Sequence, residues 1–185
     1  MAVNHVGIED YLKGVLASEM PKRWPDNALG AQAIAARTYA LYQKAMNQEE
    51  LFDVSADIYS QVYGGEESES WESNRIVDDT KGIVLVYNDT LIPAFFHSCC
   101  GGKTEYGDMV WNKINFPCLK SVKCDYCADS PQFYWTYNIK IEELKQKLKA
   151  MYPDIKGSVR SVEVVKETRS GRADTLLLRS DSGEY

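Results

Sequence analysis

The chain has 185 residues, of which 44% are hydrophobic and 26% charged, so length and composition suit a folded domain and exclude a fully disordered chain. The net charge is −6, from 21 basic and 27 acidic residues, and an acidic chain lacks the positive surface expected of a nucleic-acid-binding protein. No apolar run approaches the roughly 20 residues that cross a bilayer. Residues 1–10 also lack the basic and apolar stretches of a signal peptide.

The first predicted element is a short helix over residues 7–16. Its apolar residues recur at helical spacing, namely Ile8, Tyr11, Leu12, Val15 and Leu16. Pro21 opposes a continuation of this helix past residue 20. We therefore expect Glu19 at a junction between the helix and the following loop.

A second helix is predicted from Pro25 to about Asn47, because proline is favoured at the start of a helix. It is apolar on almost every side and rich in alanine, at positions 28, 31, 33, 35, 36, 40 and 45. Such a helix is typically central and buried. Arg37 stands among its apolar residues, so its charge requires a carboxylate or another hydrogen-bonding partner.

The later elements alternate between helices and hairpins. We predict a helix over 71–81 that Gly82 ends, and a hairpin of strands 83–87 and 91–97 around Asn88 and Asp89. Residues 98–135 form a long predicted loop, followed by a helix over 141–151 and a hairpin of strands 159–167 and 175–179. This mixture indicates an α+β fold in which a buried Ala-rich helix packs with β-hairpins and a long loop stapled by cysteines.

Glu19 and Arg37 are the first candidate pair. A glutamate at a helix end beside a buried helix can serve as a general acid and base if its surroundings keep it protonated. A nearby arginine works against that state, so Arg37 more plausibly orients a substrate, or orients Glu19 from a distance. The alternative is a structural ion pair between the two.

The segment from His97 to Thr104 is the second candidate. Its glycines at 101 and 102 permit tight backbone geometry and the close approach of a ligand. A phosphate-binding loop is excluded, because that motif requires glycine at position 97. A nucleophilic Cys99 or Cys100 assisted by His97 is a weaker alternative.

The five cysteines form the third candidate, and their odd number prevents complete disulfide pairing within one chain. Cys124 and Cys127 have the spacing of a zinc knuckle, and Cys100 is a further ligand candidate. Cys118, Cys99 or His97 could supply the fourth ligand. We expect a structural zinc site, and the alternatives are a disulfide with one remaining thiol, or free thiols.

The order of motifs resembles the SpoIID/LytB family of sporulation stage II protein D lytic transglycosylases and amidase enhancers. Glu19-Met20-Pro21 and the run from Ala36 to Ala40 carry its signature. Further matching stretches are residues 57–64, 80–87, 94–104, 110–111 and 117–122, so that the resemblance extends from residue 8 to about 140. Residues 55–60 hold no cysteine or histidine, so the metal site that some sporulation members carry there is expected to be absent.

The resemblance implies a lytic transglycosylase that cleaves the MurNAc–GlcNAc bond of peptidoglycan and leaves 1,6-anhydroMurNAc ends. Glu19 would be the catalytic acid and base, with no cofactor required. The matching cleft motifs imply substrate contacts from Arg37, Gln61, Tyr63, His97, Ser98, Gly101, Gly102 and Thr104. Some relatives combine a cysteine at position 100 with Cys-x2-Cys, which favours Cys100, Cys124 and Cys127 acting together.

The resemblance also predicts the setting of the protein. Its partners would be glycan strands and a cell-wall amidase, without nucleic acid, and it would act outside the membrane in the bacterial cell envelope. We expect residues 1–185 to form a single SpoIID-like domain that is truncated at its C-terminus. The alternative functions are a non-catalytic amidase enhancer that binds peptidoglycan, and a hydrolytic muramidase. A muramidase requires a second carboxylate, for which Asp57, Glu105 and Asp108 are candidates.

Overall fold

The computed structural model describes residues 2–111 and 116–185 and confirms the α+β fold class. The chain divides into two compact units, Met1–Phe96 and His97–Tyr185, which we call the N-terminal and the C-terminal unit. In the described ranges, no helix combines the length and the apolar character that a membrane span requires.

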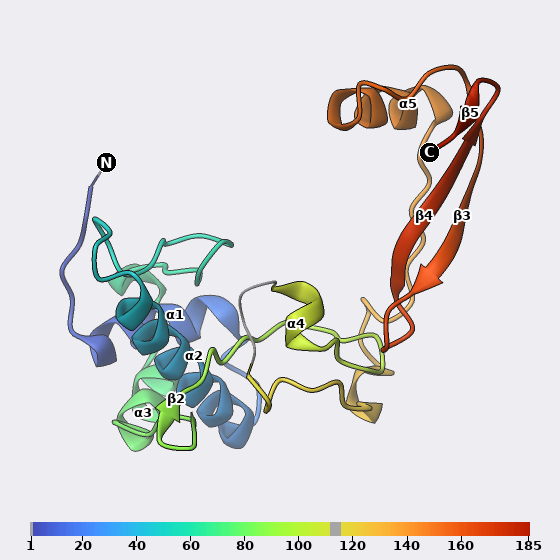
Figure 1. The fold of residues 1–185 in the computed structure, drawn as a ribbon. Coiled ribbons are helices and arrows are strands. Elements are labelled where there is room, and N and C mark those ends of the chain that lie inside the picture. Colours follow the sequence, from blue (N-terminus) through green and yellow to red (C-terminus); the bar gives the residue numbers. More distant parts are fainter. Residues whose placement is uncertain (1, 112–115) are drawn as a thin grey trace. The chain divides into compact units, whose positions relative to one another are not determined.

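Three helices build the N-terminal unit: α1 (Ile8–Glu19), α2 (Asp26–Met46) and α3 (Trp71–Asp79). They pack against one another, with the single-turn helix η1 (Glu66–Ser68) beside α1 (Figure 1). All three predicted helices are confirmed. Their inward faces form an apolar core that contains Leu12, Val15, Leu16, Leu29, Ala33, Ala36, Ile76 and Val77.

A short hairpin follows α3. Strands β1 (Val86–Tyr87) and β2 (Thr90–Leu91) pair antiparallel around Asn88 and Asp89, whose φ angles of 49° and 59° are those of a tight left-handed turn. The predicted turn is confirmed, but both strands are shorter than the sequence suggested.

Helix α2 explains why these strands are short. The N–H of Leu85 donates to Thr38 Oγ1 (2.9 Å), and the carbonyl of Ile83 accepts from Arg37 Nη1 (3.2 Å). These backbone groups thus form their hydrogen bonds with side chains of α2 and not with a partner strand. After β2, Pro93 has no N–H to donate to a ladder.

The C-terminal unit contains a three-stranded antiparallel sheet in the order β3-β4-β5. Its strands are β3 (Val159–Glu167), β4 (Ala173–Ser180) and β5 (Gly183–Glu184). The predicted hairpin around residues 170 and 171 is confirmed. The helix over 141–151 is confirmed as α5 (Ile141–Met151), and the long loop before it carries α4 (Gly107–Val110) and η2 (Asp125–Cys127).

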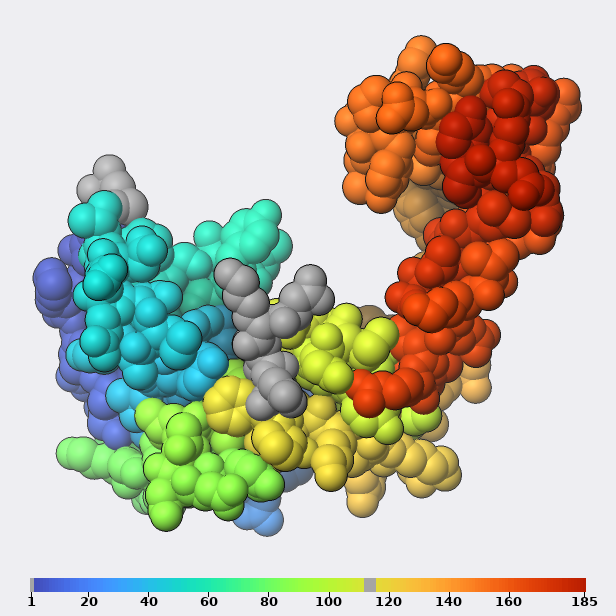
Figure 2. Space-filling model, in the orientation of Figure 1, coloured from blue at the N-terminus to red at the C-terminus, as the bar shows by residue number. Residues whose placement is uncertain are grey.

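Little of the C-terminal unit is buried among its described residues. Helix α5 contains no buried residue, and the sheet buries Leu178. The side chains of the β3–β4 hairpin, orange to red in Figure 2, lie largely open to solvent. This unit therefore depends on polar contacts to a greater degree than the N-terminal unit.

Candidate active site and cysteine cluster

Glu19 is the last residue of α1, as the sequence predicted. The chain leaves the helix at Met20, whose backbone is extended, and Pro21 follows. The Glu19 side chain is half-buried, and its Oε1 accepts a hydrogen bond from the backbone N–H of Val62 (2.9 Å). Among the ion pairs of the described residues, none includes Glu19. Its carboxyl group is thus oriented by a neutral donor, and no basic side chain of the described ranges forms an ion pair with it.

Gln61 fixes the loop that supplies the Val62 donor. Its side chain is 1% exposed, accepts from the hydroxyl of Tyr11 (3.2 Å) and donates to the carbonyl of Ala36 (3.2 Å). These two bonds connect the loop to α1 and to α2. Gln61 is thus a buried anchor of this loop, and its predicted substrate contact stays a prediction.

Tyr63 lies against α1 beside the same site. Its ring stacks on Tyr11 with the centroids 5.1 Å apart, and Gly14 leaves the space for it, because a Cβ there would lie 2.7 Å from Tyr63. Tyr63 is half-buried, so part of its ring is available to a ligand. Sequence reasoning missed Gly14, although an isolated glycine in a helical pattern signals a close approach.

Tyr11 acts as a hydrogen-bond donor in this cluster. Burial raises the pKa of Tyr11 far above its usual range, and the neighbouring Tyr39 and the charge of Glu19 raise it further. The phenol therefore stays protonated, and its O–H donates a hydrogen bond to Gln61. Tyr11 was predicted as an apolar residue of the helix, and its polar role was not foreseen.

Arg37 has a carboxylate partner, as expected, but the partner is Glu9 and not Glu19. The guanidinium is 1% exposed, and its Nη2 lies 2.7 Å from Glu9 Oε2 while Nε donates to Oε1 (3.1 Å). It also donates to the carbonyls of Val77 and Ile83. Arg37 thus has a structural role in this unit, while its predicted substrate contact stays a prediction.

The ion pair with Arg37 affects the pKa of Glu9. Burial alone raises the pKa of Glu9, but the hydrogen bond and the charge of Arg37, with the N–H of Gly82, hold it below its ordinary value. The carboxylate is therefore ionised at neutral pH. The ion pair connects the first turn of α1 with the middle of α2 and with the end of α3.

The remaining predicted substrate residues belong to the C-terminal unit. His97 and Ser98 are exposed, and Gly101 and Gly102 adopt φ angles of 64° and 93°, which other residues rarely adopt. Thr104 exchanges hydrogen bonds with Val122, through N to the carbonyl (2.9 Å) and through Oγ1 from the N–H (2.8 Å). Glycines 101 and 102 thus form a turn before a segment paired with residues 121–124, while the predicted substrate contacts of this segment stay predictions.

The tip of the β3–β4 hairpin holds this turn from another side. Arg172 Nη2 donates to the carbonyls of Cys100 (2.8 Å) and Lys103. Glu105 Oε2 accepts from the hydroxyls of Thr168 (2.7 Å) and Ser170 (2.5 Å). Burial raises the pKa of Glu105, but these hydroxyls outweigh it, so the pKa lies below its ordinary value. No pattern in the sequence pointed to Arg172.

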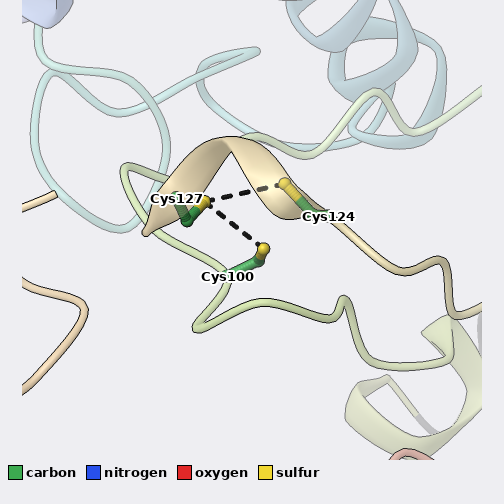
Figure 3. Close-up of side chains that lie close together, drawn as sticks. All are labelled: Cys100, Cys124 and Cys127. Carbon is green, nitrogen blue, oxygen red and sulfur yellow. Dashed lines mark hydrogen bonds between the residues drawn. The ribbon is translucent and has the colours of Figure 1, made fainter. Parts of the chain in front are cut away.

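Three cysteines meet beside the turn, as the sequence predicted. The Sγ atom of Cys127 lies 3.4 Å from that of Cys100 and 3.7 Å from that of Cys124 (Figure 3). Burial and the two neighbouring thiols raise the pKa of Cys100 to about 11, whereas the backbone N–H of Tyr126 lowers that of Cys124. In the described part of the chain, no fourth histidine, cysteine or acidic side chain completes this group, so the fourth ligand expected from Cys118, Cys99 or His97 is not found.

Comparison with known proteins identifies relatives for most of the chain. Residues 1–87 match the model of a family described as Stage II sporulation protein. An uncharacterized protein of Brachyspira hyodysenteriae is 37% identical over 179 residues, which are 96% of this chain and 48% of that protein. The Amidase enhancer of Bacillus subtilis is 40% identical over 138 residues, 74% of this chain and 18% of the relative.

The Stage II sporulation protein D of Bacillus subtilis is 32% identical over 162 residues, which cover 80% of this chain and 47% of that protein. The chain thus spans about half the length of two of these relatives and a smaller part of the third.

Proposed function

The chain belongs to the SpoIID family, and from this membership and the geometry of Glu19 we propose that it cleaves peptidoglycan glycan strands as a lytic transglycosylase. The observation that carries the proposal is the half-buried Glu19 carboxyl group, which a backbone N–H orients and which no cation pairs in the described residues. A general acid and base must lose and regain a proton during the reaction. A carboxylate bound to arginine, like Glu9, would stay ionised.

One carboxyl group suffices for the reaction. Glu19 donates its proton to the oxygen of the MurNAc–GlcNAc β-1,4 bond as that bond to C1 breaks. The resulting carboxylate then accepts the proton of the 6-hydroxyl group of the same muramyl residue while this oxygen bonds to C1. The products are a 1,6-anhydroMurNAc end and a free 4-hydroxyl group on GlcNAc, and Glu19 regains its proton. Water is not consumed.

The contacts of the other candidate carboxylates favour this reaction over hydrolysis. Asp57 Oδ1 accepts from the hydroxyl of Ser55 and from the N–H of Tyr59, which is the pattern of a turn. Glu105 is held by two hydroxyls, and Asp108 accepts both of its hydrogen bonds from Arg169 at 2.7 Å. A hydrolase needs a second carboxylate as base or nucleophile, and each of these three already has a structural partner.

The same substrate sets the proposed location and partners. Peptidoglycan lies outside the cell membrane, so we place the activity in the bacterial cell envelope, in sporulation or in related remodelling of the wall. Tyr63 offers a half-exposed ring to a sugar, since aromatic rings stack well on apolar sugar faces.

A second candidate function is a binding module that assists a cell-wall amidase. The Amidase enhancer of Bacillus subtilis matches 74% of this chain, and its name carries this alternative. Such a module would need the surface beside Glu19, and it would not need a proton on that residue.

A digest of purified glycan strands, analysed by mass spectrometry, tests these functions. We expect anhydro ends from the wild-type protein and a loss of about 10²–10⁴-fold in rate for Glu19→Gln, with binding of the strands retained. Glu66→Gln, which changes an exposed glutamate of the same unit, serves as the control and should keep the full rate. Reducing ends would indicate a muramidase, and binding without cleavage would indicate the enhancer module. An active Glu19→Gln variant would contradict the assignment of Glu19.

A further inference from the structure

We propose that Cys100, Cys124 and Cys127 bind one divalent metal ion of the zinc class through three thiolates. The proposal starts from the distances between their sulfur atoms, which are 3.4 Å and 3.7 Å for the two close pairs, with all three within 4.8 Å of one another. Zinc bound at about 2.3 Å from each sulfur in a tetrahedron separates the sulfurs by about 3.8 Å. The three thiols therefore stand close to the spacing that one ion would impose.

Backbone turns and hydrogen bonds around the cluster bring the three sulfur atoms together. Gly101 and Gly102 reverse the chain directly after Cys100, and the N–H of Cys124 donates to the carbonyl of Gly102 (2.9 Å). This bond sets Cys124 opposite Cys100. The turn of η2 then returns Cys127 to the same side, and Figure 3 shows the three side chains pointing toward one another.

The surroundings of the cluster leave its sulfur atoms free to bind an ion. Cys100 is 7% exposed, and Arg172 bonds to its carbonyl and not to its sulfur. The described residues provide three protein ligands, so a water molecule or another small ligand takes the fourth position. Thiolates are the binding form, so the ion displaces the thiol protons when it binds.

A disulfide is the competing chemistry. It would join two of the three sulfurs at about 2.05 Å and leave the third without a partner. The two close separations in the cluster differ by 0.3 Å, from 3.4 Å to 3.7 Å, so Cys127 is not paired selectively with one neighbour. Because all three sulfur atoms surround one position, the arrangement favours a bound metal ion over a disulfide.

The proposed ion has a structural consequence for the C-terminal unit. It would fix the turn at residues 100–104 to the segment 121–127, two stretches that backbone hydrogen bonds already pair. The readouts below concern metal and thiols, so the proposal can fail while the glycan-cleaving function stands, and the reverse also holds.

Metal content tests the proposal directly. The full chain is purified with reductant, loaded with Zn²⁺, freed of excess metal by gel filtration and analysed for zinc. We expect close to one zinc per chain for the wild type and for Cys118→Ser, whose cysteine is exposed and lies outside the cluster. Cys100→Ser, Cys124→Ser and Cys127→Ser should each lose most of the zinc. Equal zinc in all variants, or none in the reduced wild type, would overturn the proposal.

Two measurements on the wild-type chain avoid variants that fail to fold. Co²⁺ added in place of zinc should produce an intense sulfur-to-cobalt absorption that saturates at one ion per chain and disappears when Zn²⁺ is added. Alkylation mapped by mass spectrometry should label Cys118 quickly in the zinc-loaded protein, and the three cluster cysteines only after a chelator is added. Equal alkylation of the cluster cysteines with and without the chelator would contradict the metal site. A cluster disulfide that persists in the zinc-loaded sample would contradict it as well.

Discussion

Each of the two units of the molecule is stabilised internally in its own way. The N-terminal unit buries an apolar core between three helices, and the ion pair of Glu9 and Arg37 crosses it. In the described residues of the C-terminal unit, the buried side chains are those of Cys100 and Leu178. Hydrogen bonds, among them those from Arg172 to the carbonyls of Cys100 and Lys103, connect its segments.

This difference shows what each unit requires from its sequence. A small unit that buries little apolar surface needs cross-links or metal ions to remain folded. The helical unit can tolerate loss of one polar contact at its surface, whereas a buried charge inside its core must keep its partner. The following substitutions separate these two kinds of stabilisation, and we order them from the largest expected effect.

Removing the buried ion pair should have the largest effect on stability. Glu9→Gln leaves the guanidinium of Arg37 buried without a counter-charge, so the free energy of unfolding of the N-terminal unit should fall by about 3–5 kcal/mol. Urea denaturation followed by far-UV circular dichroism measures this loss. Asp10→Asn, at an exposed acid of the same helical turn, is the matched control and should cost less than about 1 kcal/mol.

Acid should remove the same contribution in the wild type. The pKa of Glu9 is lower in the folded than in the unfolded chain, so the pair stabilises the fold above the unfolded value of 4.5 and loses this effect as pH falls through the folded pKa. The difference in stability between the wild type and Glu9→Gln should therefore shrink below about pH 4.5. A difference that does not change with pH would contradict the ion-pair explanation.

Filling the space at Gly14 should have an intermediate effect. Gly14→Ala places a Cβ 2.7 Å from the ring of Tyr63, and overpacking of this kind costs about 1–3 kcal/mol, less the gain of about 1 kcal/mol in helix propensity. Thermal unfolding and the near-UV circular dichroism of the tyrosines report the change. Gly30→Ala, where the nearest atom lies 3.6 Å away, is the control and should leave the fold as stable or more stable. Equal effects of both substitutions would exclude a specific contact with Tyr63.

Loss of Arg172 should have the smallest effect on stability, and it should be confined to the C-terminal unit. Arg172→Ala removes the donor to the carbonyls of Cys100 and Lys103, at a cost of about 1 kcal/mol. Hydrogen exchange of the amides in residues 100–104 should become faster, while exchange in α1 and α2 stays unchanged. Arg160→Ala removes an exposed arginine of β3 and should change neither region. Faster exchange in both units would contradict the conclusion that Arg172 stabilises the C-terminal unit alone.

The helices and the cysteine cluster could be predicted from the sequence because their signals are local. Apolar spacing and Pro21 determine where α1 ends, and the knuckle spacing of Cys124 and Cys127 brings two sulfurs to one side of the chain. Cys100 was a ligand candidate from the cysteine pattern, and the family resemblance further favoured it.

The partner of Arg37 could not be predicted, because the rotation of α1 about its own axis decides which glutamate faces α2. Both Glu9 and Glu19 belong to that helix, and the structure assigns the first to Arg37. The donor to Glu19 is a backbone N–H, which carries no side-chain signal. The predicted lengths of β1 and β2 were also wrong. Thr38 and Arg37 make hydrogen bonds with backbone groups that a partner strand would otherwise pair.

Glu9, the ion-pair partner of Arg37, and Glu19, the proposed catalytic residue, lie on the same helix, α1. Ten residues separate Glu9 from Glu19, which corresponds to about 15 Å along the axis. Because an α-helix is stiff over this distance, the ion pair at one end of α1 also restrains the end that carries Glu19. If α1 carries the proposed catalytic residue, a substitution in its first turn will change the rate of glycan cleavage without altering the Glu19 side chain itself.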